Sequence, residues 1–348
     1  FGLLLDADLA QTNRDFIRLT IKKMTQPIVF KDMRLELRPV VGVALYPEQG
    51  KNTLSLVRHA QVAADMPEAL EHAVSFYRPE HDQYNTRRLM MVSELKHAIE
   101  QGHLELFFQP KLDLKSEEIM GLEALVRWHH ERYGLVRPDE FIALAEETGQ
   151  IKPLTRWVIR SAFDAQIAFK KQGLNVSMSI NVSALNLHES DLIVFLKEQL
   201  YASGIEPGKV CLELTETSMM TNPLEAIEVL ERVRRLGVFV SIDDFGAGYS
   251  SLAYLKSLPA SEIKIDKSLI TGICDDVNSE MVARATIEMC QGLGFKIVAE
   301  GVETKPVMDK LVELNCDIIQ GYIMTPPLPY PKLIQWIDSN TKDRRFIS

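Results

Sequence analysis

The spacing of apolar residues changes character near residue 103. Before it, strand-like apolar runs alternate with segments of helical period, and Pro67 interrupts the second helical segment. This pattern predicts strands at 1–5, 36–47 and 72–77 and helices at 7–24 and 53–70. The polar stretch 78–88 has the composition of a linker, and 89–102 has the period of an amphipathic helix ended by glycine. We therefore expect a first domain at 1–77, a linker and connecting helix at 78–102, and a second domain at 103–348.

After residue 103, short apolar segments alternate with helical ones. The apolar segments read LELFFQPKLDL, VSMSINVSA, VCLELTET, VFVSIDDFG, EIKIDKSL, KIVAEGVET and DIIQGYIMTPP. Such alternation is typical of parallel strands joined by crossover helices. About 240 residues with this many strands favour an α/β fold of the (β/α)8 barrel type over an open doubly wound sheet. Because no G-x-G-x-x-G follows an early strand, a dinucleotide-binding domain is disfavoured.

Composition narrows the class of protein. The 348 residues are 46% apolar and 25% charged, which is ordinary for a soluble globular chain. A net charge of -9 argues against a surface that binds nucleic-acid polymers or anionic membranes. The four cysteines form no C-x-x-C pair, so we expect buried, reduced thiols and a cytoplasmic location. Since residue 1 is Phe, we expect a fragment whose membrane anchor, if it has one, lies upstream.

Polar side chains recur where the apolar segments end. These strand-end residues are Asn181, Glu213, Asp243, Asp244, Lys264, Asp266, Glu300 and Gln320. Glu123 lies inside the apolar run 119–128, with Arg127 four residues further on. Any one of them alone would be a turn former or a helix cap. Parallel barrel strands all end at one face, however, so we expect one opening to be surrounded by Asn181 and five acids: Glu123, Glu213, Asp243, Asp244 and Glu300.

Five carboxylates in one pocket cannot all stay ionised without cations. The available ligands are oxygens only, which selects Mg2+ or Mn2+ over Zn2+. Asp243 and Asp244 could serve two ions, and a two-metal carboxylate site suits in-line displacement at phosphorus. Arg127 could then neutralise a phosphate oxygen, and Lys264 could orient or deprotonate the attacking water. A salt bridge to Asp266 is the structural alternative for Lys264.

The motifs from 104 to 328 closely resemble the EAL-domain cyclic-di-GMP phosphodiesterases. Glu123-Ala124-Leu125 forms the naming motif within GLEALVRW. The other matching motifs are FFQPKLDL, PDEFIALAEETGQI, SINVSA, LELTET, IDDFGAGYSSLAYLK, IKIDKS, VAEGVET and QGY. The resemblance implies a TIM-like barrel whose first strand runs against the others. Departures are minor: Phe108 stands where Tyr is frequent, and Ala247 where Thr is common.

The resemblance also implies roles for individual residues. It implies that Glu123, Asn181, Glu213 and Asp243 bind a first metal ion, and Asp243, Asp244 and Glu300 a second. It implies that Glu123, Lys264 and Glu300 take part in catalysis and that Gln109, Arg127 and Gln320 contact the substrate. Glu216 and Asp266 would support the DFGAGYSS loop (244–251), which in this family couples substrate, metal and dimer interface. A homodimer through the barrel is therefore expected.

Residues 1–77 resemble the second half of a GGDEF diguanylate cyclase domain, in partial and degenerate form. FGLLL could directly follow the last letter of the GGDEF motif, which itself is not in this chain. VVGVALYP matches a later strand of that α+β domain. In AQVAADMPE, the family residues Asp, Tyr, Ala and Lys are replaced by Gln61, Asp65, Pro67 and Glu68. Losing the lysine removes a phosphate contact, so we expect no synthesis of cyclic-di-GMP from GTP.

The preferred hypothesis is metal-dependent hydrolysis of cyclic-di-GMP to linear pGpG. A second hypothesis is a receptor that binds the dinucleotide in the same barrel without cutting it. A third is a Mg2+-dependent, proton-abstracting barrel enzyme with Lys264 as the base. The third hypothesis leaves Arg127 and the DFGAGYSS loop without a role.

Overall fold

The computed structural model contains two compact units, 1–93 and 94–348. The described residues are 3–4, 17, 19, 21, 23, 28–30, 33–35, 39–64, 66, 74–79, 86–189, 191–219, 222–246 and 252–341. In this part of the chain, no helix is both long enough and apolar enough to cross a membrane.

The first unit contains a parallel pair of strands covered by one helix. Strand β3 (Val41–Val43) pairs with β4 (Val74–Phe76), and α2 (Thr53–Ala64) packs against β3. The approach of α2 is close, because a Cβ on Gly42 would lie 1.8 Å from the Ala60 carbonyl oxygen. Of the helical segment predicted at 53–70, residues 53–64 are helical, while Asp65 and residues 67–70 lie outside the described part of the chain.

The structure differs from the sequence-based prediction elsewhere in the first unit. Leu3 and Leu4 have no regular structure, so the strand predicted at 1–5 is wrong there, and its other residues lie outside the described part. Residues 17, 19, 21 and 23 are helical, whereas the rest of the helix predicted at 7–24 is not described. An antiparallel pair, β1 (Ile28–Phe30) and β2 (Met33–Leu35), was not predicted.

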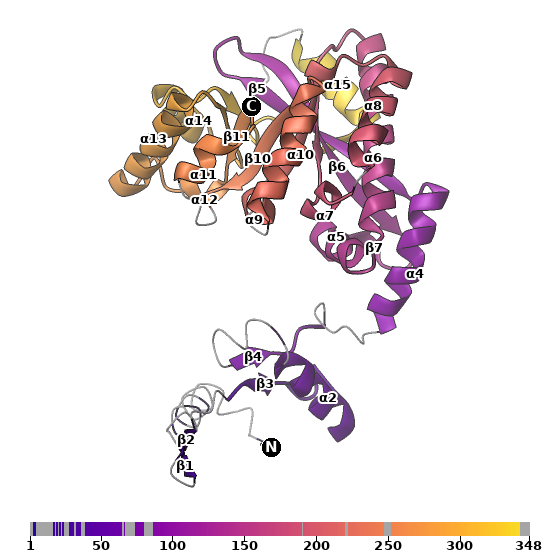
Figure 1. Ribbon diagram of the computed structural model, residues 1–348, viewed down its shortest axis with the longest axis vertical. Coiled ribbons are helices and arrows are strands. Elements are labelled where there is room, and N and C mark those ends of the chain that lie inside the picture. The colour runs from indigo at the N-terminus through magenta and orange to yellow at the C-terminus, as the bar shows by residue number, and fades with distance from the viewer. Residues whose placement is uncertain are drawn as a thin grey trace. The chain divides into compact units, whose positions relative to one another are not determined.

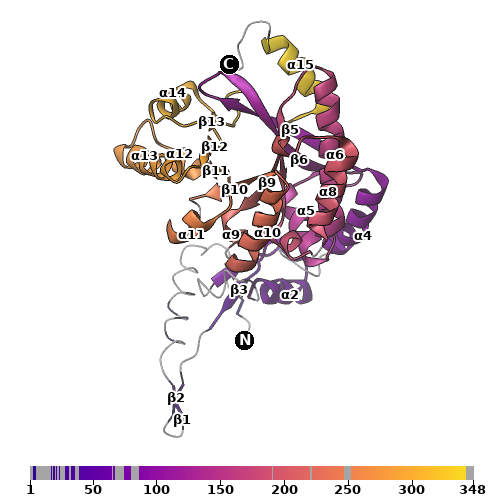
Figure 2. The same cartoon turned by 45° about the horizontal axis from the view of Figure 1, so that its top comes forward.

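The second unit contains a closed barrel of eight strands (Figures 1 and 2). The barrel strands are β5 (Leu104–Asp113), β6 (Glu118–His130), β8 (Ser177–Asn181), β9 (Val210–Thr215), β10 (Phe239–Phe245), β11 (Glu262–Ile265), β12 (Lys296–Ala299) and β13 (Ile318–Ile319). Their order is β5-β13-β12-β11-β10-β9-β8-β6, and pairing of β6 with β5 closes the ring. Strand β5 is antiparallel to both neighbours, and the other pairs are parallel. The predicted barrel, with its reversed first strand, is confirmed.

Helices surround the barrel, as Figure 2 shows for α6, α8, α10, α13 and α14. Helix α4 (Thr86–Gln101) begins before residue 94 and continues into this unit. The other helices of this unit are α5 (Pro138–Glu147), α6 (Ile151–Lys171), α7 (Ala184–Leu187), α8 (Leu192–Ser203), η3 (Pro207–Lys209), α9 (Glu216–Met219), α10 (Pro223–Arg235), α11 (Leu252–Ser257), α12 (Lys267–Ile270), α13 (Val277–Gly292), α14 (Lys305–Glu313) and α15 (Tyr330–Thr341). Two short strands, β7 (Gly134–Val136) and β14 (Leu328–Pro329), pair antiparallel with β6 and β5, respectively.

Helix α10 illustrates how the sequence places the next strand. It begins at Pro223, whose fixed φ suits the first helical turn, and buries an apolar face that includes Val229 and Val233. Arginines in its last turn complement the helix dipole, and Gly237 then turns the chain at a φ of 85°. Strand β10 therefore starts at a fixed point, and its far end carries Asp243.

Candidate active site

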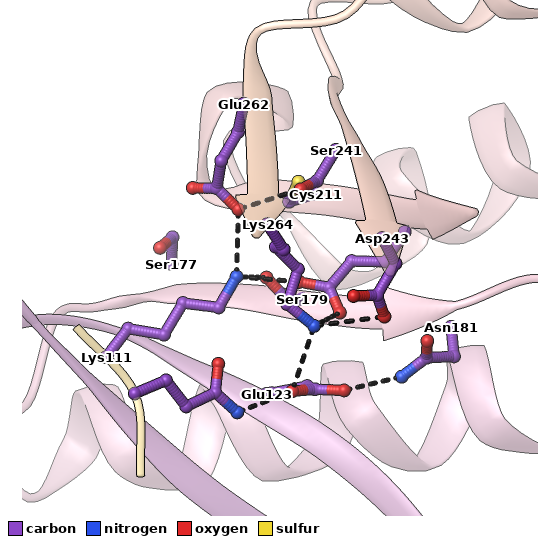
Figure 3. A network of polar contacts seen from close by, with 12 residues as sticks. Lys111, Glu123, Ser177, Ser179, Asn181, Cys211, Ser241, Asp243, Glu262 and Lys264 are labelled. Carbon is purple, nitrogen blue, oxygen red and sulfur yellow. Dashed lines mark hydrogen bonds and ion pairs between the residues drawn. The ribbon is translucent and has the colours of Figure 1, made fainter. Parts of the chain in front are cut away.

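The carboxyl ends of the parallel strands bring the predicted polar residues together. Glu123 comes from β6, Asn181 from β8, Glu213 from β9, Asp243 from β10 and Lys264 from β11. Figure 3 shows Asn181 pointing toward Glu123, and Lys264 among the acids. Glu213 and Lys264 are fully buried at 0% exposure, so the charges of this cluster must balance one another rather than rely on water.

Lys264 lies at the centre of this cluster. Its Nζ is 2.7 Å from Glu300 Oε1, 2.9 Å from Glu213 Oε2, 3.1 Å from Asp243 Oδ2 and 3.3 Å from Glu123 Oε2. Burial alone would lower the pKa of Lys264, but the four carboxylates outweigh it and hold that pKa well above its usual value. Asp266, considered from the sequence as a salt-bridge partner, instead caps α12 by accepting a bond of 2.9 Å from the Ser268 N–H.

Amide groups complete the surroundings of Glu123. Asn181 Nδ2 donates to Glu123 Oε1 at 2.7 Å, and Gln320 Nε2 donates to Glu123 Oε2 at 2.6 Å. Gln320 Nε2 also lies 3.0 Å from Gln109 Oε1. Within the described residues, the buried Gln320 Oε1 has no hydrogen-bond partner.

The donor set fits divalent cations. Carboxylate oxygens of Glu123, Glu213 and Asp243 lie within 4.8 Å of one another, and so do those of Asp243, Asp244 and Glu300. Asp243 belongs to both groups. Carboxylate oxygens are hard ligands of the kind that Mg2+ and Mn2+ accept. The arrangement therefore offers two adjoining cation sites with one shared ligand.

A distortion of β10 lets two consecutive aspartates serve this cluster. In a regular strand, neighbouring side chains point to opposite faces. Asp244 has a φ of 55°, and the pairing of β10 with β11 shifts register between Ile242 and Phe245. The Asp244 N–H also donates to Asp243 Oδ1 at 2.9 Å. This irregularity turns Asp244 toward the site that Asp243 faces.

The acids of the cluster have opposite pKa shifts. Burial would raise the pKa of Glu213, but the Lys111 and Lys264 ammonium groups outweigh it and lower this pKa to about 2. Burial raises the pKa of Glu300 to about 8, with Lys264 opposing the shift and neighbouring acids adding to it. Burial also raises the pKa values of Glu123 and Asp243. Such a cluster binds further positive charge readily.

Lys111 is a buried cation that the sequence interpretation missed. Its Nζ lies 2.6 Å from Glu213 Oε1, 2.9 Å from Ser179 Oγ and 3.0 Å from Glu262 Oε1. A signal was present in the sequence, since Lys111 stands two positions after Gln109 and shares its face of the strand.

Glu216 is buried at the start of α9, and its Oε2 accepts a bond of 3.0 Å from the Gly246 N–H. This bond places Glu216 beside the beginning of the DFGAGYSS loop. Gly246 has a φ of 98°, and a Cβ there would lie 2.2 Å from Leu269 Cδ1. Ala247 and the residues up to 251 lie outside the described part of the chain.

The rim of the site contains the remaining predicted residues. A cavity of about 400 Å3 is lined by Gln109, Asp266, Lys267, Glu300, Gly301, Glu303, Gln320, Gly321 and Tyr322. Arg127 is half-buried on β6, where its guanidinium lies 5.7 Å from the centre of the Phe107 ring and donates to the Val126 carbonyl. Burial lowers the pKa of Arg127, while Glu123 opposes that shift.

Fold and site together define an eight-stranded α/β barrel with a lysine-centred carboxylate cluster at the carboxyl ends of its strands. The chain belongs to the EAL domain family, whose model matches residues 92–327.

Two curated relatives illustrate this membership. The chain is 38% identical over 335 residues to the cyclic di-GMP phosphodiesterase NbdA of Pseudomonas aeruginosa, covering 95% of this chain and 43% of NbdA. It is 33% identical over 297 residues to the cyclic di-GMP phosphodiesterase PdeR of Escherichia coli, covering 85% of this chain and 45% of PdeR. The chain thus spans less than half the length of either relative.

Two solved structures are similar to this chain in fold and sequence. The PaMucR phosphodiesterase in its c-di-GMP complex superposes with a TM-score of 0.66 at 36% identity. That alignment covers 70% of this chain and 99% of the PaMucR chain. An EAL domain protein from Listeria monocytogenes aligns with a TM-score of 0.63 at 33% identity, covering 71% of this chain and 97% of the other.

Proposed function

We propose that this chain hydrolyses cyclic-di-GMP to linear pGpG in a metal-dependent reaction. The observation that carries the proposal is the pair of carboxylate groups sharing Asp243, arranged around Lys264 at one end of the barrel. Support also comes from relatives that are named cyclic di-GMP phosphodiesterases and from a related phosphodiesterase structure that contains c-di-GMP. In the proposed reaction water attacks phosphorus, the P–O3′ bond breaks, and the 3′ oxygen gains a proton.

The proposed ligands of two Mg2+ or Mn2+ ions follow from the donor set. We assign Glu123, Asn181, Glu213 and Asp243 to one ion, and Asp243, Asp244 and Glu300 to the other. Ions bound there would stabilise negative charge on the phosphate and lower the pKa of a coordinated water. Arg127 would bind a phosphate oxygen, and Gln109 and Gln320 would orient the nucleotide from the cavity that they line.

Lys264 acts in this proposal as a proton-bearing group. Its raised pKa supports a role in donating hydrogen bonds to water or phosphate, and argues against the base required by a proton-abstracting enzyme. Glu123, Lys264 and Glu300 would be the residues closest to the reacting atoms. Glu216 would support the DFGAGYSS loop through Gly246, and Asp266 would fix the start of α12 beside the cavity.

The test is turnover of labelled cyclic-di-GMP with Mn2+, with pGpG separated by chromatography. We expect cleavage by the parent chain and a loss of several orders of magnitude in Glu123→Ala, with the fold intact by circular dichroism. Glu118→Gln, at the exposed start of the same strand, is the matched control and should cleave normally. Binding without cleavage by the parent would support the receptor alternative and refute the hydrolase.

We also propose that 1–77 is a degenerate GGDEF-like domain without cyclase activity, followed by a linker and connecting helix at 78–102 and the barrel domain at 103–348. The parallel β3–β4 pair with α2 between them in sequence supports this assignment. Incubation with GTP should yield no cyclic-di-GMP, and any such product would refute the proposal.

We further propose a homodimer through the barrel, which light scattering should detect and which a monomeric mass would contradict.

A further inference from the structure

A second polar layer lies beneath the carboxylate cluster. On a strand, residues two positions apart share a face, so each site residue has a neighbour one layer deeper in the barrel. Ser179 stands two positions before Asn181, Ser241 before Asp243, and Glu262 before Lys264. Because β5 is antiparallel, the residue deeper than Gln109 follows it, and this is Lys111. We call Lys111, Ser179, Ser241 and Glu262 the polar floor.

The polar floor is unusual for a barrel interior, where branched apolar side chains normally fill the layers. Lys111 is 2% exposed, and its three ammonium hydrogens are matched by three acceptors. Glu262 Oε1 accepts from Lys111 at 3.0 Å and from Ser241 Oγ at 2.9 Å. Figure 3 shows the Lys111 ammonium pointing between these groups. Glu262, which is partly buried, thus balances the charge of the buried Lys111.

Glu213 connects the polar floor to the site above it. Its Oε1 accepts from Lys111 at 2.6 Å, while its Oε2 accepts from Lys264 at 2.9 Å. The carboxylate is therefore held from both sides, and each oxygen has a separate partner. Without Lys111, Oε1 would have no cation on the floor side, and the side chain could turn about its last torsion, which has no sharp rotamer preference.

We propose that Lys111 is a positioning residue: it holds Glu213 Oε1 from the polar floor and thereby aims Oε2 at the carboxylate cluster. The inference rests on the proposed function, because Glu213 matters for catalysis only as a ligand of the proposed metal centre. Glu262 has a complementary role, since it compensates the charge of Lys111 so that Glu213 remains free to compensate a cation above it. Groups that orient metal ligands typically contribute about 10- to 100-fold to metal affinity.

The experiment must separate orientation from charge. Lys111→Met removes the anchor, but it also removes a positive charge near the proposed cation, and these two changes act in opposite directions on cation binding. Lys111→Met/Glu262→Gln removes one positive and one negative charge together, so the summed charge of the interior is unchanged. Lys115→Met, at an exposed position shortly after Lys111, is the matched control.

The full chain, stripped of metal, is titrated with MnCl2 in a calorimeter without nucleotide, and its thermal unfolding is followed separately. We expect Lys111→Met to unfold at a lower temperature, because Glu213 and Glu262 lose a buried counter-charge. The double variant should regain most of that stability yet bind Mn2+ about tenfold more weakly than the parent. With cyclic-di-GMP, its kcat should rise again as Mn2+ is increased, which a purely structural defect would not produce.

A folded double variant that binds Mn2+ within about twofold of the parent would overturn the positioning role. A double variant as unstable as Lys111→Met would overturn the complementary role of Glu262, because Glu262 would then not be the balancing charge. Failure of the proposed function is recognised separately: the parent itself would bind no Mn2+ or would not cleave the dinucleotide.

Discussion

Replacing Lys264 with Met tests whether one cation holds the carboxylate cluster together. The substitution removes a fully buried ammonium group and preserves most of the side-chain volume. Four carboxylates within 3.3 Å of Nζ lose their common counter-charge at once. Lys264→Met should therefore destabilise the metal-free protein and, separately, lower turnover.

The magnitude follows from the burial of this group. Removing one partner of a buried ion pair costs about 3–5 kcal/mol. For a domain of about 150–250 residues, each kcal/mol shifts the melting temperature by about 2–4 °C, so we expect a decrease of about 6–20 °C. A divalent ion can replace the missing charge: Mn2+ at about one hundred times its Kd contributes about 2.7 kcal/mol of stability. Metal should therefore recover much of the loss.

Protonation of the acids also limits the loss, and its sign can be worked out. The pKa values of Glu123, Asp243 and Glu300 are raised in the folded chain, and for Glu300 the value is about 8. A carboxyl with a raised folded pKa favours folding at low pH, and that contribution is lost as pH rises through the window between its unfolded and folded pKa values. Removing Lys264 raises these values further. Destabilisation by Lys264→Met should therefore grow from about pH 5 to pH 8.

The assay is thermal unfolding of parent and variant in EDTA and in Mn2+, repeated across this pH range. Lys256→Met, an exposed lysine on α11, is the control and should melt like the parent. Turnover of Lys264→Met should stay low even where Mn2+ restores its stability, because the proposed hydrogen-bond donor is missing. A variant that melts like the parent in EDTA, or that gains no more stability from Mn2+ than the parent does, would refute the reasoning.

Three further predictions concern the loop and the metal. Glu216→Gln weakens a charge-assisted bond to the Gly246 N–H worth about 1.5–3 kcal/mol, so turnover should fall and partly return at high Mg2+; an unchanged rate and Mg2+ dependence would contradict this. Gly246→Ala forces a φ of 98° on alanine and places Cβ 2.2 Å from Leu269 Cδ1, so urea unfolding should show a loss of at least about 1–3 kcal/mol, and an unchanged midpoint would speak against it. Chelation should abolish hydrolysis and Mg2+ or Mn2+ restore it, whereas Ca2+ should bind yet support little turnover because of its longer, looser coordination; full activity after exhaustive chelation would exclude a metal requirement.

The arrangement of the barrel could be predicted because two simple patterns coincide in this sequence. Apolar runs mark the strands, and polar residues such as Glu213, Asp243 and Glu300 mark where the strands end. Parallel strands exit at one face, so residues far apart in sequence had to meet. The reversed direction of the first strand could not be obtained from periodicity, because a strand and its reverse have the same alternation; it came from the family resemblance.

Other features depend on local backbone geometry or on weak signals. Asp244 follows Asp243 directly, and only the register shift and positive φ explain how both face one site. The strand predicted at 1–5 is wrong at Leu3 and Leu4, because periodicity identifies an apolar run but not the strand with which it would pair. The antiparallel pair that begins at Ile28 lacked a clear alternation of its own, so no strand was predicted there.

The direction of β5 has a consequence for the site itself. In register, Gln109 is paired with Glu123 and Lys111 with Gly121, so the glutamine lies level with the cluster and the lysine one layer deeper. If β5 ran parallel to its neighbours, the same two residues on the same face would exchange layers. The ammonium would then lie among the cluster's ligands beside that of Lys264, and the amide would lie beneath. Antiparallel pairing of this one strand thus places a cation below Glu213, where it can hold one carboxylate oxygen and leave the other facing the site.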